Sequence, residues 1–492
     1  MKSNKIVIVA ILIVALLGAG LTGALSRSVR ERVTWGENGR PPQAGRASLA
    51  QMNSFALALL LGGLRGPLVM FLWTSSETAK NDRNLEDVDT QIEWIRMLQP
   101  EFDTVHIFQI WNKAYNHSVQ MANPSNKYTT ILDALEYARS VDRERPQNIN
   151  ILTAIGQTYF DKLGNSSEKA YYRRRVREET QQHDVKGKLT REDPEFKPLE
   201  HEICLGAEGR IVSAKKQDLQ YLLKYEPFPQ GISPFAIAFN YYKWSQVLQS
   251  EKGQRHAQMS DLVIDSRPAL ALKNWAADEW ERGRRFEILA YGRKTPIERT
   301  PMEAVTADLS PGAAPELPDD IGRALYCYEL TARLGDDAMV EYERHLKSYL
   351  VNESTYLSHI DEIRAMQQLV RADAAFLGKN VSTAEDRAVV AGLYHKAKIL
   401  YARMILKYYV DDQVINTLKP QYTSPMQRAD IDRRTFAKSL SDIDVLRAFD
   451  LALQLSQALP FDTQAEDRSE YLGNFMRIDA RLKSLESAAA PQ

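Results

Sequence analysis

The 492-residue chain has only two cysteines, Cys204 and Cys327, which lie far apart and outside any C-x-x-C motif. This spacing excludes a disulfide-stapled scaffold and a cysteine zinc site. The eight histidines form no H-E-x-x-H motif and no pair four residues apart, so a helical metal site is not indicated either. We therefore expect no metal and no other cofactor.

The sequence also lacks an excess of charge of either sign. Lysine and arginine together number 63 and aspartate and glutamate 64, which leaves a formal net charge of −1. Such a balance gives no general attraction to nucleic acid, so no nucleic-acid partner is expected. The phosphate-binding motif G-x-x-x-x-G-K-[ST] and the nucleophile motif G-x-S-x-G are missing, and we expect the protein not to be an enzyme.

One long uncharged run is present at the start of the chain, from Ile6 to Ser26. A membrane-spanning helix needs about 20 apolar residues, so residues 1–26 are predicted to form a single transmembrane anchor that contacts the membrane through residues 6–26. A cleaved signal peptide is the alternative, because Thr22 and Ala24 resemble a small-residue cleavage site.

The charges that flank this run are nearly balanced, with Lys2 and Lys5 before it and Arg27, Arg30 and Arg32 after it. The short amino-terminal tail favours a signal-anchor whose tail stays inside the cell. We therefore expect a single-pass protein of the inner or cytoplasmic membrane, with the bulk of the chain periplasmic or exterior.

A tether and a second apolar run follow the anchor. Residues 27–50 contain glycine, a proline pair and little apolar periodicity, which is typical of a flexible tether. Residues 59–73, LLLGGLRGPLVMFLW, are apolar but carry Arg65 and the pair Gly66-Pro67. An arginine at the bilayer centre costs roughly 2.5 kcal/mol or more, so a helix buried in a soluble core is favoured over a membrane-embedded hairpin.

From residue 85 onward, apolar residues recur with helical spacing and no strand pattern competes, which predicts an all-α fold. The later predicted helices are 235–248, 269–289, 321–350, 355–377, 384–410 and 440–458. Ser382-Thr383-Ala384-Glu385 is typical of a capping box. The proline-rich residues 295–320 are predicted to be a loop that separates helical domains at 51–294 and 321–486.

Residues 134–159 carry a repeat signal. Ala134 and Ala138 share a helix face, Pro146 ends that helix, and Leu152-x-x-Ile155-Gly156-x-x-Tyr159 follows. This pattern resembles the tetratricopeptide repeat, in which the glycine allows paired helices to pack closely. Leucine replaces the usual tryptophan, and the spacing of Pro100 and Pro146 exceeds one repeat. The resemblance implies an irregular solenoid of helical hairpins.

Larger segments also resemble a group of uncharacterised bacterial membrane-anchored proteins with tetratricopeptide-like helices. The segments are LGGLRG at 61–66, Trp73, IEWIRMLQP at 92–100 and FQIWNKAYNHSV at 108–119, and the likeness covers about residues 55–290. The resemblance implies membrane anchoring and a helical fold, and it brings no assigned activity.

The segment WNKAYN at 111–116 is the candidate binding site. Asn112 and Asn116 share one helix face, and Trp111 and Tyr115 share another. Asn112, Tyr115 and Asn116 are predicted to line a groove in which the amides hydrogen-bond to a peptide backbone. The alternative is that the asparagines satisfy carbonyl groups between helices.

These observations predict a membrane-tethered helical-repeat scaffold that mediates protein–protein interactions at the cell envelope, because repeat arrays offer long binding surfaces. Two alternatives are kept. One is an envelope enzyme whose acidic site is assembled by the fold, and the other is an accessory subunit of a membrane transport complex.

Overall fold

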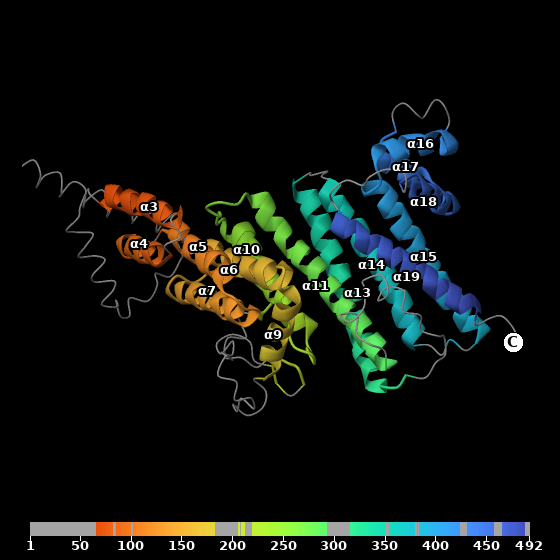
Figure 1. The fold of residues 1–492 in the computed structure, drawn as a ribbon, viewed down its shortest axis with the longest axis horizontal. Coiled ribbons are helices and arrows are strands. Elements are labelled where there is room, and N and C mark those ends of the chain that lie inside the picture. The colour runs from red at the N-terminus through yellow and green to blue at the C-terminus, as the bar shows by residue number, and fades with distance from the viewer. Residues whose placement is uncertain are drawn as a thin grey trace, which may run out of the picture. The chain divides into compact units, whose positions relative to one another are not determined.

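The computed structural model confirms the all-α prediction for the part of the chain that it describes, in which no strand occurs (Figure 1). The described residues are 65–81, 85–99, 102–182, 205–206, 208–211, 219–292, 315–349, 354–378, 381, 383–423, 431–456 and 465–487. The predicted anchor at 6–26, the tether at 27–50 and most of the loop at 295–320 lie outside them. Among the described helices, none combines the length and the apolar character needed to cross a bilayer.

The chain divides into two compact units, Met1–Ile264 and Asp265–Gln492. In the first unit the helices are α3 (Arg65–Asn81), α4 (Leu85–Leu98), α5 (Asp103–Trp111), η2 (Asn112–His117), α6 (Ser118–Gln120), α7 (Pro124–Glu144), α8 (Ile149–Gln157), η3 (Thr158–Gly164), α9 (Lys169–Gln182), η5 (Leu223–Tyr225) and α10 (Pro234–Lys252). Helix α11 (Asp261–Ala290) crosses the division, which therefore precedes the predicted boundary at 295–320.

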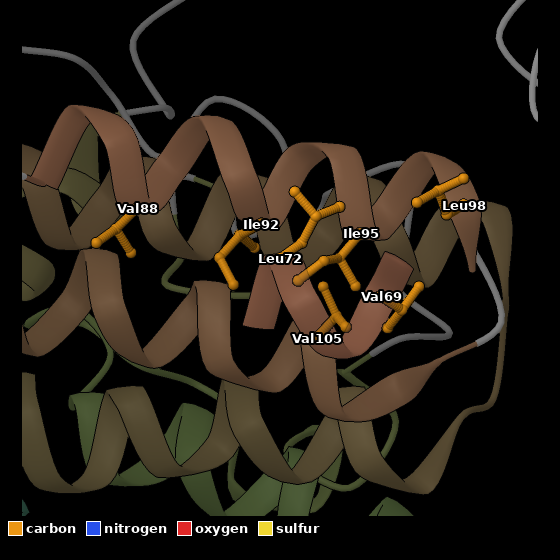
Figure 2. Packing of buried hydrophobic residues seen from close by; sticks show 7 residues of the cluster. All are labelled: Val69, Leu72, Val88, Ile92, Ile95, Leu98 and Val105. Atoms are coloured by element: carbon orange, nitrogen blue, oxygen red, sulfur yellow. The ribbon is translucent and has the colours of Figure 1, made fainter. Parts of the chain in front are cut away.

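Residues 65–73 of the second apolar run form the first half of helix α3, and this helix packs against α4. Figure 2 shows Val69 and Leu72 of α3 meeting the α4 side chains at 88, 92, 95 and 98 and Val105 of α5 in one apolar cluster. The adjacent Met70 and Phe71 are instead 72% and 68% exposed. The described part of this run is thus a helix with one buried face and one exposed face.

Helices α8 and η3 lie closely along α10, and two glycines allow this contact. A Cβ atom added at Gly156 would stand 2.9 Å from Cδ1 and Cε1 of Tyr242, and one at Gly164 would stand 2.5 Å from Cε1 of Phe235. Any side chain at either position would overlap an aromatic ring, so the glycines fix how near the helices approach. The close contact predicted for Gly156 is present, and its partner is α10.

The other residues of the predicted repeat are buried or end a helix. Ala134 and Ala138 on α7 and Leu152 and Ile155 on α8 are fully buried. Tyr159 is also buried, and its hydroxyl accepts a hydrogen bond of 2.7 Å from Arg139. Helix α7 ends at Glu144, so Pro146 follows its last turn, and Asn148 caps α8 by accepting from the amides of residues 150 and 151.

The second unit continues from α11 through α13 (Pro318–Tyr349), α14 (Ser354–Gly378), α15 (Ala384–Tyr408), α16 (Asp412–Tyr422), α17 (Arg433–Ser439), α18 (Asp442–Ser456) and α19 (Ala465–Ser487). Each predicted helix after residue 320 overlaps one of these. The N-cap of α15 is Thr383, whose hydroxyl accepts from the Asp386 amide at 3.1 Å and donates to its carboxylate at 2.7 Å. The predicted box therefore begins one residue later than the pattern indicated.

Two buried carboxylates hold α19 in the core of this unit. Arg477 pairs with Asp373 on α14, and Arg481 pairs with Glu287 on α11. Tyr394 on α15 donates to Asp373 at 2.9 Å. A buried charge is costly unless it is paired, and each of these carboxylates is paired with an arginine.

Tyrosine completes the same network from α13, where Tyr328 donates to Glu287 at 2.6 Å. Burial, together with the nearby carboxylates, raises the pKa of Tyr328 and Tyr394 well above the ordinary value, so both phenols stay protonated and can donate. The network joins five helices of the second unit and explains how a C-terminal helix rich in charge is buried there.

Candidate functional site

A surface hollow of about 400 Å³ lies in the first unit where four helical segments meet. Its lining residues come from α4, α5, η2 and α7, and they are Thr90, Glu93, Trp94, Gln109, Lys113 and Tyr137. Two aromatic rings, one amide, one hydroxyl and one charge of each sign therefore surround a single space. This mixture is typical of a site that takes an apolar group and fixes its orientation through a few polar contacts.

Trp94 is the most exposed of these aromatic residues. Helix α4 turns Ile92 and Ile95 into the core, so Trp94 between them faces outward and is 55% exposed. Glu93 beside it is held by Arg96, whose Nε lies 2.9 Å from Oε2 and whose Nη2 contacts Oε1. A bidentate pair of this kind fixes the carboxylate in one geometry.

Tyr137 enters the hollow from α7, and its hydroxyl lies 2.9 Å from Nδ1 of the buried His106. Burial raises the pKa of the Tyr137 phenol well above its ordinary value. The phenol therefore remains neutral near pH 7, and its hydroxyl is oriented by the imidazole. Tyr137 thus supplies a fixed aromatic wall.

Lys113 belongs to η2, where the helix takes π-helical hydrogen bonding from Asn112 to His117. Such a turn is wider than an α-helical turn and changes the direction of the side chains that follow it, and it occurs often at functional sites. In this turn Lys113 lines the hollow, whereas Asn112 and Ala114 are buried. The local π-helix therefore places the one cationic residue of the hollow.

The three residues predicted to form a binding groove do not line this hollow. Asn112 is fully buried, and its Oδ1 accepts a hydrogen bond of 2.7 Å from Asn116. Its Nδ2 lies 3.1 Å from Nε2 of His117. This arrangement matches the alternative in which the asparagines bond internally, and the partners here are side chains of the same turn.

Tyr115, the third predicted groove residue, is half-buried. Its ring stacks on that of Trp111 at 6.1 Å with an interplanar angle of 18°, and the ammonium of Lys162 lies 5.3 Å from the ring centre. These contacts link η2 to the neighbouring aromatic residues and to η3. A groove formed by Asn112, Tyr115 and Asn116 stays a prediction.

The sequence does contain a signal for Trp94, which lies outside the predicted site WNKAYN. In IEWIRMLQP the buried positions are Ile92, Ile95 and Leu98, so Trp94 falls on the polar side of an amphipathic helix. A large aromatic side chain on that side is exposed to water, which is unfavourable, and it adds nothing to the core. Its presence there favours a binding role. The other lining residues come from separate helices, and only the fold shows that they meet.

Within the described residues, no group of three or more histidine, cysteine, aspartate or glutamate side chains is placed to hold a metal ion. Comparison of the chain with protein-family models, with curated proteins and with solved structures finds no match. The resemblance to bacterial membrane-anchored proteins therefore stays a prediction, and the site has to be interpreted from its own geometry.

Proposed function

We propose that the protein is a membrane-tethered helical scaffold at the cell envelope and that the hollow of the first unit docks a segment of a partner protein. The observation that carries the proposal is the exposed Trp94 at the edge of a hollow whose other aromatic wall, Tyr137, is held in place. Tryptophan and tyrosine are enriched among the residues that contribute most to protein–protein binding, because each buries a large area at a low entropic cost.

The chemistry of the lining indicates the partner segment. An apolar side chain would pack between Trp94 and Tyr137, while Gln109 and Thr90 are suited to hydrogen bonds with a peptide backbone. Lys113 adds one positive charge, and the charge of Glu93 is largely balanced by Arg96. A segment with one large apolar residue followed or preceded by an acidic residue fits this surface best.

The tether and the repeat belong to the same proposal. Residues 6–26 would anchor the chain in the inner or cytoplasmic membrane, and the helical hairpins of an irregular tetratricopeptide-like solenoid would present the docking surface outside it. The tight contact of Gly156 on α8 with Tyr242 on α10 supports close packing between helices of this unit.

A docking role is favoured over the alternative of an enzyme with an acidic site. Acid–base chemistry needs a carboxylate that can reach substrate with a tuned proton affinity. In the hollow the lining carboxylate is Glu93, which Arg96 binds through both oxygens. The buried carboxylates Asp373 and Glu287 are likewise paired with arginine in a packed core.

The proposal is tested by selecting displayed random peptides on the full-length chain in detergent micelles. We expect the selected peptides to share a large apolar residue next to an acidic one. We expect Trp94→Ala to weaken their binding at least about thirtyfold, the effect of losing roughly 2 kcal/mol from a binding hot spot. Ile443→Ala, which removes an apolar side chain that is 65% exposed on α18, serves as the control and should leave binding unchanged.

Two results would contradict the docking proposal. Peptides that bind wild type and Trp94→Ala equally would show that the hollow is not the docking site. Selection of no peptide at all, with the protein shown to be folded by its helical circular dichroism, would argue against peptide docking as its role.

A further inference from the structure

The outward face of α3 is uncharged over most of its length. From Gly66 to Ser76 the helix carries no ionisable residue. Its exposed residues in this stretch are Gly66, Pro67, Met70, Phe71 and Thr74, with Thr78 one turn further along. A Cβ atom added at Gly66 would meet nothing within 4 Å, so this side of the helix is open. From Gly66 to Ser76 the face therefore offers two large apolar side chains and no charge.

The hydroxyl groups on this face are satisfied within the helix. Thr74 donates to the carbonyl of Met70 at 2.9 Å, and Thr78 donates to the carbonyl of Thr74 at 3.2 Å. A hydroxyl that lacks a partner is costly to remove from water, whereas one that bonds to its own helix is not. These two hydroxyl groups can consequently leave water without losing hydrogen bonds.

The exposed apolar residue Val340 of the second unit has different surroundings. On α13, Val340 is 64% exposed, nearly as much as Phe71. The other exposed residues along α13 include Arg323, Glu329, Arg333, Asp336, Glu343 and Lys347. A single apolar residue among charges is ordinary surface, while neighbouring apolar residues on an uncharged face indicate a contact.

The adjoining sequence indicates what that contact is. The residues directly before α3, FALALLLGGL at 55–64, are uncharged, and the uncharged run at 6–26 has the length of a membrane span. A protein anchored by residues 6–26 keeps α3 within reach of a bilayer, because only residues 27–64 lie between the two. We propose that the outward face of α3, with Met70 and Phe71, rests in the lipid headgroup region, an inference that depends on the anchor in the proposed function.

The contact can be measured on the full-length chain in vesicles of phosphatidylcholine and phosphatidylglycerol. Nitroxide labels are placed at Met70→Cys, at Phe71→Cys and, as the control of similar exposure, at Val340→Cys. Wild-type protein labelled in parallel gives the background from Cys204 and Cys327. Collisions with oxygen, which concentrates in lipid, and with a water-soluble nickel chelate then report the depth of each label.

We expect labels 70 and 71 to gain oxygen collisions and lose nickel collisions relative to label 340, at a depth of about 5–10 Å below the headgroup surface. If the protein floats with the vesicles but all three labels report water, the lipid contact is wrong and the tether stands. If labels 70 and 71 are shielded from both reagents, protein covers the face and the lipid contact is again wrong. Failure of wild-type protein to float with the vesicles overturns the anchor and the lipid contact together.

Discussion

The substitution Gly156→Ala tests a close helix contact of the first unit, between α8 and α10. The added Cβ would lie 2.9 Å from two ring atoms of Tyr242 and 3.3 Å from Cβ of Tyr241. Carbon atoms in contact normally stay about 3.5–4.0 Å apart, so the ring would have to move by roughly half an ångström or more. Tyr242 is fully buried against Phe160 and has little room to do so.

The expected magnitude follows from two opposing terms. Overpacking of a core costs about 1–3 kcal/mol, while replacing glycine by alanine inside a helix gains about 1 kcal/mol. Gly156→Ala should therefore lower the free energy of unfolding by about 0–2 kcal/mol. Gly156→Leu should lower it by about 3 kcal/mol or more, because the rest of its larger side chain has no space beside Tyr242 and Tyr241. As the control, Gly392→Ala on α15 should be stabilising by about 0.5–1 kcal/mol, because an added Cβ there meets nothing within 4 Å.

Hydrogen exchange read by mass spectrometry separates the response of each helix, which a single melting curve of a two-unit chain does not. For Gly156→Leu we expect faster exchange in α7, α8, η3 and α10, with α13 to α15 unchanged. Equal loss of protection along the whole chain would show that the two units unfold as one. Unchanged protection of α8 and α10 would refute the close contact at Gly156.

Three further substitutions probe other parts of the account. Burial raises the pKa of Glu179 to about 7 from an ordinary 4.5, so its charged form is disfavoured in the fold. The free energy of unfolding of the first unit should therefore fall by up to roughly 3 kcal/mol as the pH rises from 4.5 to 7. Urea titrations should show that Glu179→Gln removes this fall, and a variant whose pH profile runs parallel to that of wild type would contradict the assignment. Arg481→Met leaves Glu287 buried without its ion pair, so the free energy of unfolding of the second unit in denaturant should fall by about 3–5 kcal/mol. A fall of less than about 1 kcal/mol would show that the fold does not need the pair. Thr383→Ala removes the hydroxyl that accepts from the amide of Asp386, which should destabilise the start of α15 by about 1 kcal/mol. Amide hydrogens in the first turn of α15 should then exchange faster, and unchanged exchange there would show that Thr383 is not the cap.

The helices were predictable from the sequence because each one carries its own periodicity and end signals. The predicted helix 384–410 corresponds to α15, and only its cap was placed one residue too early, because Ser382 and Thr383 are chemically alike as caps. The close contact at Gly156 was predictable for a similar reason, since a glycine inside an apolar helix indicates close packing.

The partners of these helices were not predictable. Periodicity shows which face of a helix is buried, but it does not show which other helix covers that face. Gly156 therefore meets Tyr242 on α10, which lies beyond the nearest helices in sequence. The candidate site was missed for the same reason, because Trp94, Lys113 and Tyr137 come together only through the packing of α4, η2 and α7.

The most direct test of the docking surface is photo-cross-linking in cells that express the full-length chain. A benzophenone amino acid at position 90 lines the hollow and leaves Trp94 in place, and the same probe at position 443 on α18 serves as the control. We predict a discrete protein adduct from position 90 that is absent from position 443 and is lost when Trp94→Ala is added. Identical adducts from both positions, or an adduct from position 90 that persists in Trp94→Ala, would contradict the proposal that this hollow docks a partner.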